Sequence, residues 1–254
     1  IQMILWAGGL YGINSICKSS LSQAAGAVLG AARAVEKPDG KTPIVGMTSL
    51  GTSCLKYQKR LKPELEKRGF EVAVFHATGM GGMAFESVAR EGGFACVMDF
   101  ALPELGNLLA GSVINGGSDL MVEVLDLIDF AGWQEIPAQY QDRLFHEHNR
   151  LIKSSALNGE ERRQTAREMA SRLSQSKAPV HVLMPNHGVE EWDREGGVAH
   201  DPQAFSEFLE EMRTVFTQPV RFEEIDCHIN DDAFADKALQ IFDAWLDNGT
   251  IKSA

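Results

Sequence analysis

The chain has 254 residues, of which 44% are hydrophobic and 23% charged, a composition typical of a globular protein with a sizeable core. Its formal net charge of −11 argues against nonspecific binding to nucleic acid, because such binding depends on Lys and Arg neutralising phosphates. No window approaches the roughly 18 consecutive apolar residues of a membrane span, so we predict no membrane contact. The four cysteines form no CxxC pair, so we predict a cytoplasmic protein with reduced thiols.

The first 41 residues are predicted to form a unit separate from the rest. A short strand, a turn containing glycines and a helix are expected over 1–34, and a loop rich in turn formers follows at 36–41. The chain begins at Ile1, inside an apolar segment with no targeting pattern, which predicts that a beginning is missing.

From Thr42 onward, predicted strands alternate with predicted helices. Strands are expected at 43–49, 70–76, 94–100, 179–184 and 220–227, with helices from Thr52 or Ser53, at 83–90, 103–110, 160–174, 203–216 and 231–246. This alternation predicts an α/β fold, an open parallel sheet with helices on both faces, over 42–254. Pro63 is expected to break or kink the helix in which it lies.

Four of the predicted strands end in small, polar or histidine residues. These tails are Thr48–Ser53, His76–Gly79, Asn186–Gly188 and His228–Asn230. The strand ends of an open parallel sheet point the same way, so the tails should gather along one crevice, where α/β proteins bind ligands.

The run Gly46–Ser53 has the length of a P-loop, but Thr52 stands where the lysine belongs, which excludes a true P-loop. Amides and hydroxyls at a helix start still suit a phosphate, which makes Thr48, Ser49, Gly51 and Thr52 candidate cofactor ligands. The alternative is a capped helix after a tight turn.

The run His76–Gly82 is the most specific local pattern. Gly79, Gly81 and Gly82 would expose backbone amides and let a ligand approach, because glycine lacks a Cβ. Together with Thr78 and His76 they are candidate cofactor-binding residues, and His76 is also a candidate acid, base or ligand. A flexible loop with a hydrogen-bonded histidine is the alternative.

His146 and His148 are candidate metal ligands. In an extended segment residues i and i+2 face the same side, a geometry that can clamp one divalent metal, although no third ligand is adjacent. A polar segment paired with carboxylates is the alternative.

His187, His228 and Asp99 are further catalytic candidates, and Asp99 could hold Mg²⁺ or a ribose. Structural alternatives exist here too. Asp99 could cap the helix that opens at Pro103, and Asn230 or Asp231 could cap the last helix.

Taken together, the runs 74–82, 146–149 and 228–231 resemble a family of uncharacterised bacterial, fungal and plant proteins, best known from the inhibitory domain of the tomato mosaic virus resistance protein. Residues 10–15 resemble its interdomain segment, which makes 1–41 an interdomain strand, helix and linker. The resemblance implies two Rossmann-like domains, of which this chain is the second. It also implies ATP binding, with or without Mg²⁺, assembly as a homo-dimer or tetramer, and a viral protein partner in plant relatives.

The chain departs from this family in two places. The Gly-rich nucleotide-binding first domain has no counterpart here. The family also has a helix, a Gly-Ile-Pro and a strand where Asp119 of this chain runs directly into Leu120, which predicts that residues are missing near 119–125.

Three functions follow from these patterns. The first is an ATP-binding, Rossmann-like domain of an oligomeric protein of unknown reaction. The second is a metal-dependent hydrolase or lyase, in which a cluster drawn from His76, His146, His148, His187 and His228 holds a metal-bound water. The third is an interaction protein with an exposed apolar patch.

Overall fold

The computed structural model describes residues 13–37, 40–50, 54–101, 103–116 and 127–252. The chain divides into two compact units, Ile1–Lys41 and Thr42–Ala254. The first contains helix α1 (Ser15–Ala34), whose N-terminus is capped by Asn14, because the side chain of Asn14 accepts a hydrogen bond from the Cys17 amide at 2.9 Å. The strand predicted before α1, the helix cap at Thr52 or Ser53 and the missing residues near 119–125 all lie outside the described ranges.

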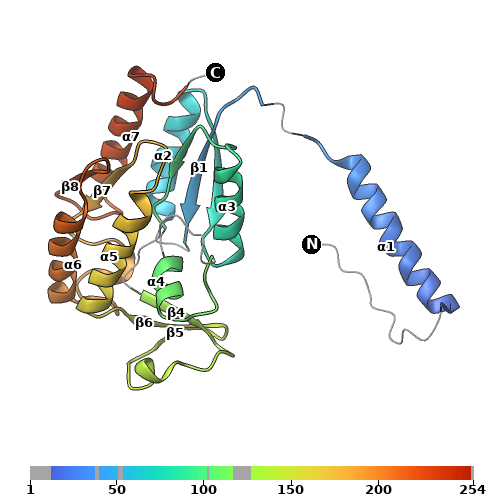
Figure 1. Ribbon diagram of the computed structural model, residues 1–254, viewed down its shortest axis with the longest axis horizontal. Helices are drawn as coiled ribbons and strands as arrows, with labels where there is room; N and C mark the ends of the chain where they lie inside the picture. Colours follow the sequence, from blue (N-terminus) through green and yellow to red (C-terminus); the bar gives the residue numbers. More distant parts are fainter. Residues whose placement is uncertain (1–12, 38–39, 51–53, 102, 117–126, 253–254) are drawn as a thin grey trace. The chain divides into compact units, whose positions relative to one another are not determined.

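The second unit is a mixed α/β domain built on parallel strands, as the alternation predicted (Figure 1). Strands β1 (Ile44–Ser49), β2 (Glu71–His76) and β3 (Cys96–Met98) form one parallel sheet in the order β2-β1-β3. Strands β7 (His181–Pro185) and β8 (Arg221–Ile225) form a second parallel sheet. The predicted parallel strands are therefore present, but within the described residues they are divided between two sheets.

The described part of this unit contains six α-helices. They are α2 (Leu55–Lys67), α3 (Met80–Arg90), α4 (Pro103–Leu109), α5 (Gly159–Leu173), α6 (Pro202–Val215) and α7 (Asp232–Asp247). The break expected at Pro63 is absent, because α2 continues through it. An interior proline costs about 3 kcal/mol, whereas Leu61 and Leu65, which flank it, are both fully buried and contribute about 1.5–3 kcal/mol each.

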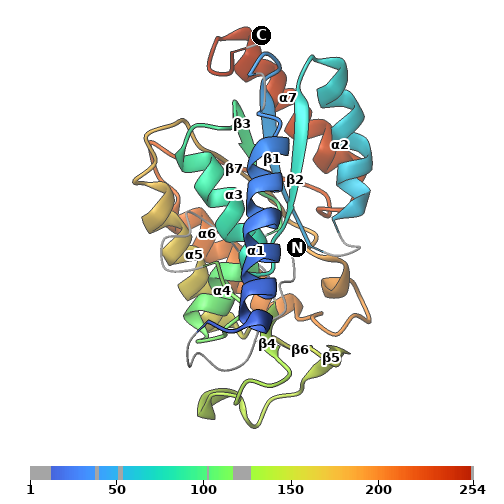
Figure 2. The ribbon, with the colours of Figure 1, turned by 90° about the vertical axis from the view of Figure 1, so that its right-hand side faces the viewer.

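The two faces of β1 show why helices cover both sides of its sheet. Val45 and Met47 point to one face and belong to a core shared with α2 and α7, here called the α2–α7 core. Gly46 points to the other face, where a Cβ would stand 2.7 Å from the ring of Phe94. Glycine is therefore needed for the close approach of that ring. Figure 2 shows α2 and α3 on either side of these strands.

An antiparallel sheet, which the sequence did not predict, lies at one end of the unit beyond α4 (Figures 1 and 2). It pairs β4 (Leu127–Ala131), β6 (Ile152–Ala156) and β5 (His146–Asn149) in the order β4-β6-β5. A tight turn joins β5 to β6, and the side chain of Asn149 accepts hydrogen bonds from the amides of Leu151 and Ile152. His146 and His148 thus lie on a strand, as expected, although its register is irregular between Glu147 and Asn149.

Helices α5 and α6 pack against each other and against β7. They share a second core, the α5–α6 core, which includes Met169, Met184, Phe208 and Met212. Helix α5 begins with a capping box, in which Asn158 and Glu161 each accept a hydrogen bond from the other's backbone amide. No helix in the described part of the chain is both long and apolar enough to cross a membrane.

Candidate functional site

The ends of the parallel strands meet at one crevice. A small cavity of about 20 Å³ there is lined by residues that follow β1, β3, β7 and β8, together with two residues at the start of α2: Leu50, Phe100, Ala101, Val189, Glu190, Ile229, Asn230, Cys54 and Tyr57. The end of β2 lies beside the end of β1, because Ser49 pairs with His76. Segments far apart in the sequence therefore share the carboxyl edge, as the strand tails predicted.

The Thr48 hydroxyl connects β1 to the turn after β3. It donates to Asp99 Oδ1 at 2.6 Å and accepts the amide protons of Phe100 and Ala101, both at 3.0 Å. Thr48 is fully buried. Its hydroxyl, which the sequence suggested as a phosphate ligand, is therefore already used to position the Asp99 turn.

Asp99 is partly exposed and lies near two buried carboxylates. Burial raises the pKa of Asp99 well above its usual range, and the nearby charges of Glu86 and Glu104 raise that pKa further, while the hydrogen bond from Thr48 opposes both effects. Glu86 and Glu104 are themselves buried. A proton or a cation is favoured at this position, and the phosphate expected nearby would be repelled by ionised carboxylates unless a cation accompanied it.

Atoms of the chain itself occupy the space next to the glycines of the loop after β2. Gly79 precedes α3 with φ of 91°, a conformation that favours glycine. Its amide donates a hydrogen bond to the Glu104 carboxylate. A Cβ on Gly81 would stand 1.8 Å from the His76 carbonyl oxygen, and one on Gly82 would stand 1.8 Å from Glu104 Oε2. These glycines thus allow α3 to approach β2 and α4.

Glu104 occupies the place predicted for an anion, since its carboxylate accepts the amide at the start of α3. Sequence reasoning missed this residue. The available signal was an acidic side chain in the first turn of the helix after the Asp99 tail. His76 and Thr78, by contrast, are exposed beside the loop and remain candidate ligand contacts, and Ser49 is half-buried. Gly51 and Thr52 lie outside the described residues.

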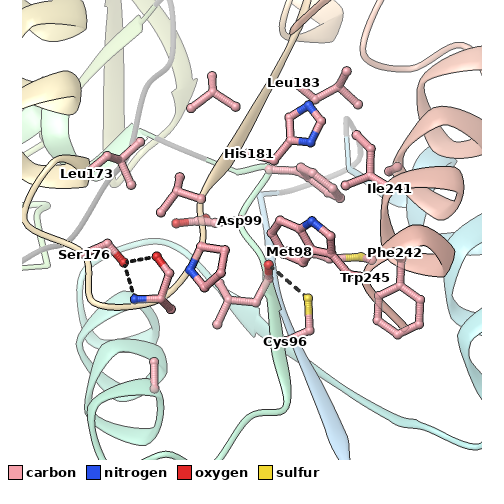
Figure 3. A pocket seen from close by; sticks show the side chains of 18 of the residues that line it. Cys96, Met98, Asp99, Leu173, Ser176, His181, Leu183, Ile241, Phe242 and Trp245 are labelled. Atoms are coloured by element: carbon pink, nitrogen blue, oxygen red, sulfur yellow. Dashed lines mark hydrogen bonds between the residues drawn. The ribbon is translucent and has the colours of Figure 1, made fainter. Parts of the chain in front are cut away.

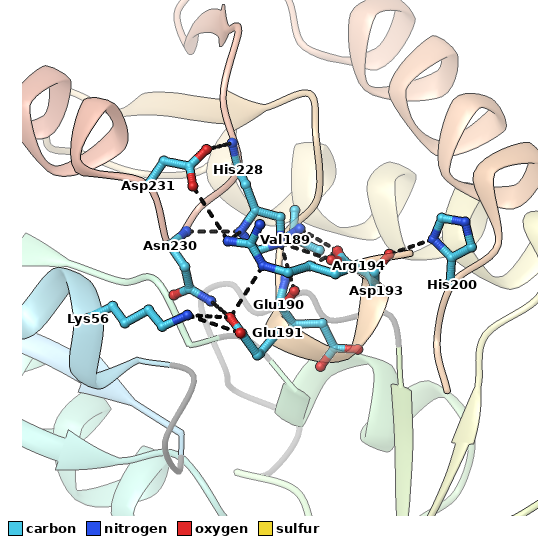
Figure 4. A network of polar contacts seen from close by, with 10 residues as sticks. All are labelled: Lys56, Val189, Glu190, Glu191, Asp193, Arg194, His200, His228, Asn230 and Asp231. Atoms are coloured by element: carbon cyan, nitrogen blue, oxygen red, sulfur yellow. Dashed lines mark hydrogen bonds and ion pairs between the residues drawn. The ribbon is translucent and has the colours of Figure 1, made fainter. Parts of the chain in front are cut away.

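His228 is the centre of a polar network formed by the loops after β7 and β8 (Figure 4). Its side chain is 2% exposed. Nδ1 lies 3.1 Å from both the Asn230 amide and Arg194 Nη2, and Nε2 lies 2.8 Å from the Glu190 carbonyl and 3.0 Å from Asp193 Oδ1. Nδ1 therefore accepts and Nε2–H donates. Both nitrogens are committed, so in this arrangement His228 positions loops and does not face a substrate.

The rim of the crevice carries paired charges. Lys56 Nζ on α2 lies 2.9 Å from Glu191 Oε1 in the 3₁₀ helix η2 (Glu191–Asp193), and Asn230 donates to Glu191 Oε2 at 3.0 Å. Arg194 lies 3.4 Å from Asp231. Asp231 accepts a hydrogen bond from the His228 amide, and this bond, together with the hydrogen bond and charge of Arg194, lowers the pKa of Asp231 against the opposing effect of burial. Sequence reasoning missed this rim, although Glu190 and Asp193 have the spacing of a capping box.

The other candidate histidines have separate surroundings. The side chain of His187 is 59% exposed and lies 3.0 Å from Asp226. The ring of His146 meets Trp192 edge-on, with centroids 5.0 Å apart. Among the described residues, no three His, Cys, Asp or Glu side chains are arranged to hold a metal. The side chain of His148 lies outside the described part, so the metal pair stays a prediction.

The fold and the crevice define a Rossmann-like α/β domain whose candidate site lies at the carboxyl edge of its parallel strands. The chain belongs to the uncharacterised protein family UPF0261, because the sequence model of the family's C-terminal domain matches residues 42–246.

Relatives in bacteria and in tomato support this assignment. A UPF0261 protein of Brucella melitensis is 50% identical over 99% of this chain and 63% of its own length. The ToMV resistance protein Tm-1 of Solanum lycopersicum is 31% identical over 91% of this chain and 33% of its own length. The ToMV susceptible protein tm-1 of the same plant matches equally well, so similarity at this level does not distinguish resistance from susceptibility. The chain therefore spans less than two thirds of the length of these relatives.

Proposed function

We propose that this domain binds Mg-ATP at the carboxyl-edge crevice, as one domain of a larger oligomeric protein. The observation that carries the proposal is the convergence of four strand ends on one crevice, with Lys56 and Arg194 at the rim. The cations suit phosphates. Asp99, which follows β3 at the same edge, can supply one carboxylate to the divalent cation that accompanies ATP, because Mg²⁺ usually takes one or two carboxylates together with phosphate oxygens and water.

Both cations at the rim form ion pairs within the chain, so phosphate binding requires an exchange of partners. Phosphate oxygens would replace Glu191 as the partner of Lys56 and Asp231 as the partner of Arg194. Both pairs are partly exposed, and exposed pairs contribute only about 0–1 kcal/mol each. Exchange of partners is therefore inexpensive. The exposed His76 and Thr78 lie beside the neighbouring loop, where they can contact the rest of the nucleotide.

The test is calorimetric titration of Mg-ATP into the purified chain, with a metal-stripped sample as control. We expect saturable binding that requires Mg²⁺, and Lys56→Ala should weaken it about tenfold, the effect of losing one charge-assisted contact. Lys62→Ala is a matched control, because Lys62 lies on the same helix with 52% of its side chain exposed against 53% for Lys56. Absence of heat, or equal effects of the two variants, would refute a nucleotide site at this crevice.

The family resemblance also supports assembly as a homo-dimer or tetramer. Light scattering coupled to size exclusion should then give a mass of two or four times the 27.8 kDa of the chain. A monomer at micromolar concentration would contradict this part of the proposal. No observation in the described residues favours the alternative of a metal-dependent hydrolase or lyase, since the candidate histidines have separate partners.

A further inference from the structure

A cavity of about 540 Å³ separates the two parallel sheets. Figure 3 shows Cys96 and Met98 of β3 at one side of it and His181 and Leu183 of β7 at another. The cavity reaches the carboxyl edge, because Phe100, Val189 and Ile229 line both it and the small cavity described above, and most of its lining residues are apolar.

The edges of β3 and β7 that border the cavity have no strand partner among the described residues. Strand β3 pairs with β1, and β7 pairs with β8. On β7, the carbonyl of Val180 and the amide of Asn186 both bond to β8. Peptide groups alternate in direction along a strand, so the peptide groups of His181 and Leu183 point away from β8. Both residues line the cavity.

Apolar side chains cover the cavity from both sides of the sheet plane. Ile241, Phe242 and Trp245 of α7 lie on one side, and Leu173 of α5 lies on the opposite side (Figure 3). Further lining residues belong to the two cores: Ala238 and Phe234 to the α2–α7 core, and Met169, Phe208 and Met212 to the α5–α6 core. A strand between these layers would be buried on both faces, the setting in which parallel strands are apolar throughout.

The flanking strands run in the same direction. Phe100, just after β3, and Val189, just after β7, line the same small cavity at the carboxyl edge. A segment inserted between them can therefore pair in parallel with both.

We propose that this cavity is the seat of one more parallel β-strand, of about four apolar residues, which joins the two sheets into one. A strand residue in a layered sheet occupies about 160 Å³, from a rise of about 3.3 Å, a strand spacing of about 4.8 Å and a layer spacing of about 10 Å. The 540 Å³ cavity thus accommodates three to four residues. This length agrees with the three residues of β3 and the five of β7.

Backbone hydrogen bonding favours a strand over a small apolar molecule as the occupant. A buried peptide group without a partner costs about 1–3 kcal/mol, and an apolar molecule would leave those of His181 and Leu183 unpaired. The source of such a strand is indicated by chain length. The match to the Brucella melitensis relative extends over 264 positions, at least ten more than the 254 residues here. The relative therefore has at least ten residues without a counterpart in this chain, more than the four that the strand itself needs.

The test uses the whole chain and a synthetic peptide that carries those residues of the Brucella melitensis relative that have no counterpart in this chain. Trp245 lines the cavity, so its fluorescence reports binding. Amide exchange measured by NMR at His181 and Leu183 reports backbone pairing. We expect saturable binding, and exchange at both amides slowed at least tenfold. The same peptide with proline at its centre should not bind, because proline lacks the amide proton.

A pair of variants on α7 localises the effect. Ala238→Leu places a larger side chain in the cavity and should weaken peptide binding at least tenfold, whereas Ala244→Leu, on the exposed side of the same helix, should not. The proposal is overturned if the peptide fails to bind. It is equally overturned if the peptide binds without slowing exchange at His181 and Leu183, the result expected of an apolar ligand that only fills space.

Discussion

Replacement of Gly81 by alanine tests whether the Gly-rich loop exists for packing. The added Cβ would stand 1.8 Å from the His76 carbonyl oxygen, and Cβ atoms essentially never approach other heavy atoms within 3.0 Å. The start of α3 and the end of β2 must therefore separate by about 1.2 Å, the difference between these two distances. Such overpacking costs about 3 kcal/mol at the upper end of its usual range. Alanine regains about 1 kcal/mol of helix propensity. The net loss should be about 2 kcal/mol.

Gly106→Ala is the matched control, because Gly106 also lies within a helix. Its Cβ would meet Leu157 Cδ1 at 3.6 Å, an ordinary contact. This variant should be stabilised by about 0.5–1 kcal/mol. Urea denaturation followed by circular dichroism should thus separate the two variants by nearly 3 kcal/mol, or about 6–12 °C in Tm for a chain of this size. Equal stabilities of the two variants would refute the packing role of Gly81 and would favour the interpretation that the loop is open to a ligand.

Three further predictions concern buried polar groups and one helix cap. His228→Ala should lower the free energy of unfolding by about 3 kcal/mol, because it leaves buried partners unpaired. His187→Ala, at an exposed site, should change the free energy of unfolding by less than about 0.5 kcal/mol. Equal losses for the two variants in urea titrations would argue against the network. Burial raises the pKa of Asp99 in the folded state, so its contribution to stability is complete below the unfolded pKa of about 3.9 and is lost as pH rises through the folded pKa. Asp99→Asn should therefore gain stability relative to wild type as pH rises from about 4 towards the folded pKa of Asp99, and a pH-independent difference would contradict the raised pKa. Asn158→Ala should cost about 1 kcal/mol in thermal unfolding through loss of the α5 cap, and an unchanged Tm would show that the cap is dispensable.

Part of the candidate site was accessible from the sequence. Thr48 and Asp99 were both identified as polar residues at strand ends, and they form a hydrogen bond across 51 positions. The prediction succeeded because all strands of a parallel sheet run in the same direction, so polar residues at the carboxyl end of one strand lie near those at the carboxyl end of the next. The alternation of apolar runs with amphipathic segments likewise sufficed to predict the positions of the parallel strands.

Other parts depend on partners that no local pattern reveals. Gly79 and Glu104 are 25 residues apart, and only their contact shows that the amide at the start of α3 is already bound. The sequence pattern made His228 a candidate catalytic residue, whereas the structure shows both of its ring nitrogens bound to four neighbouring residues. The antiparallel sheet was missed because its strands are short and two of them are polar: β5 consists of His146–Asn149, and β6 carries Lys153, Ser154 and Ser155, so neither has the apolar run that marks the equally short β7.

The sequence alone determined the α/β class, the order of its parallel strands and helices and the edge where polar groups collect, because these follow from local periodicity and chain direction. Only the tertiary structure decided which polar groups have free hydrogen-bonding capacity, and it alone showed the cavity between β3 and β7. The physical reason is that hydrogen-bond satisfaction and packing volume are properties of atoms brought together from distant positions, and a linear pattern records the atoms but not their neighbours.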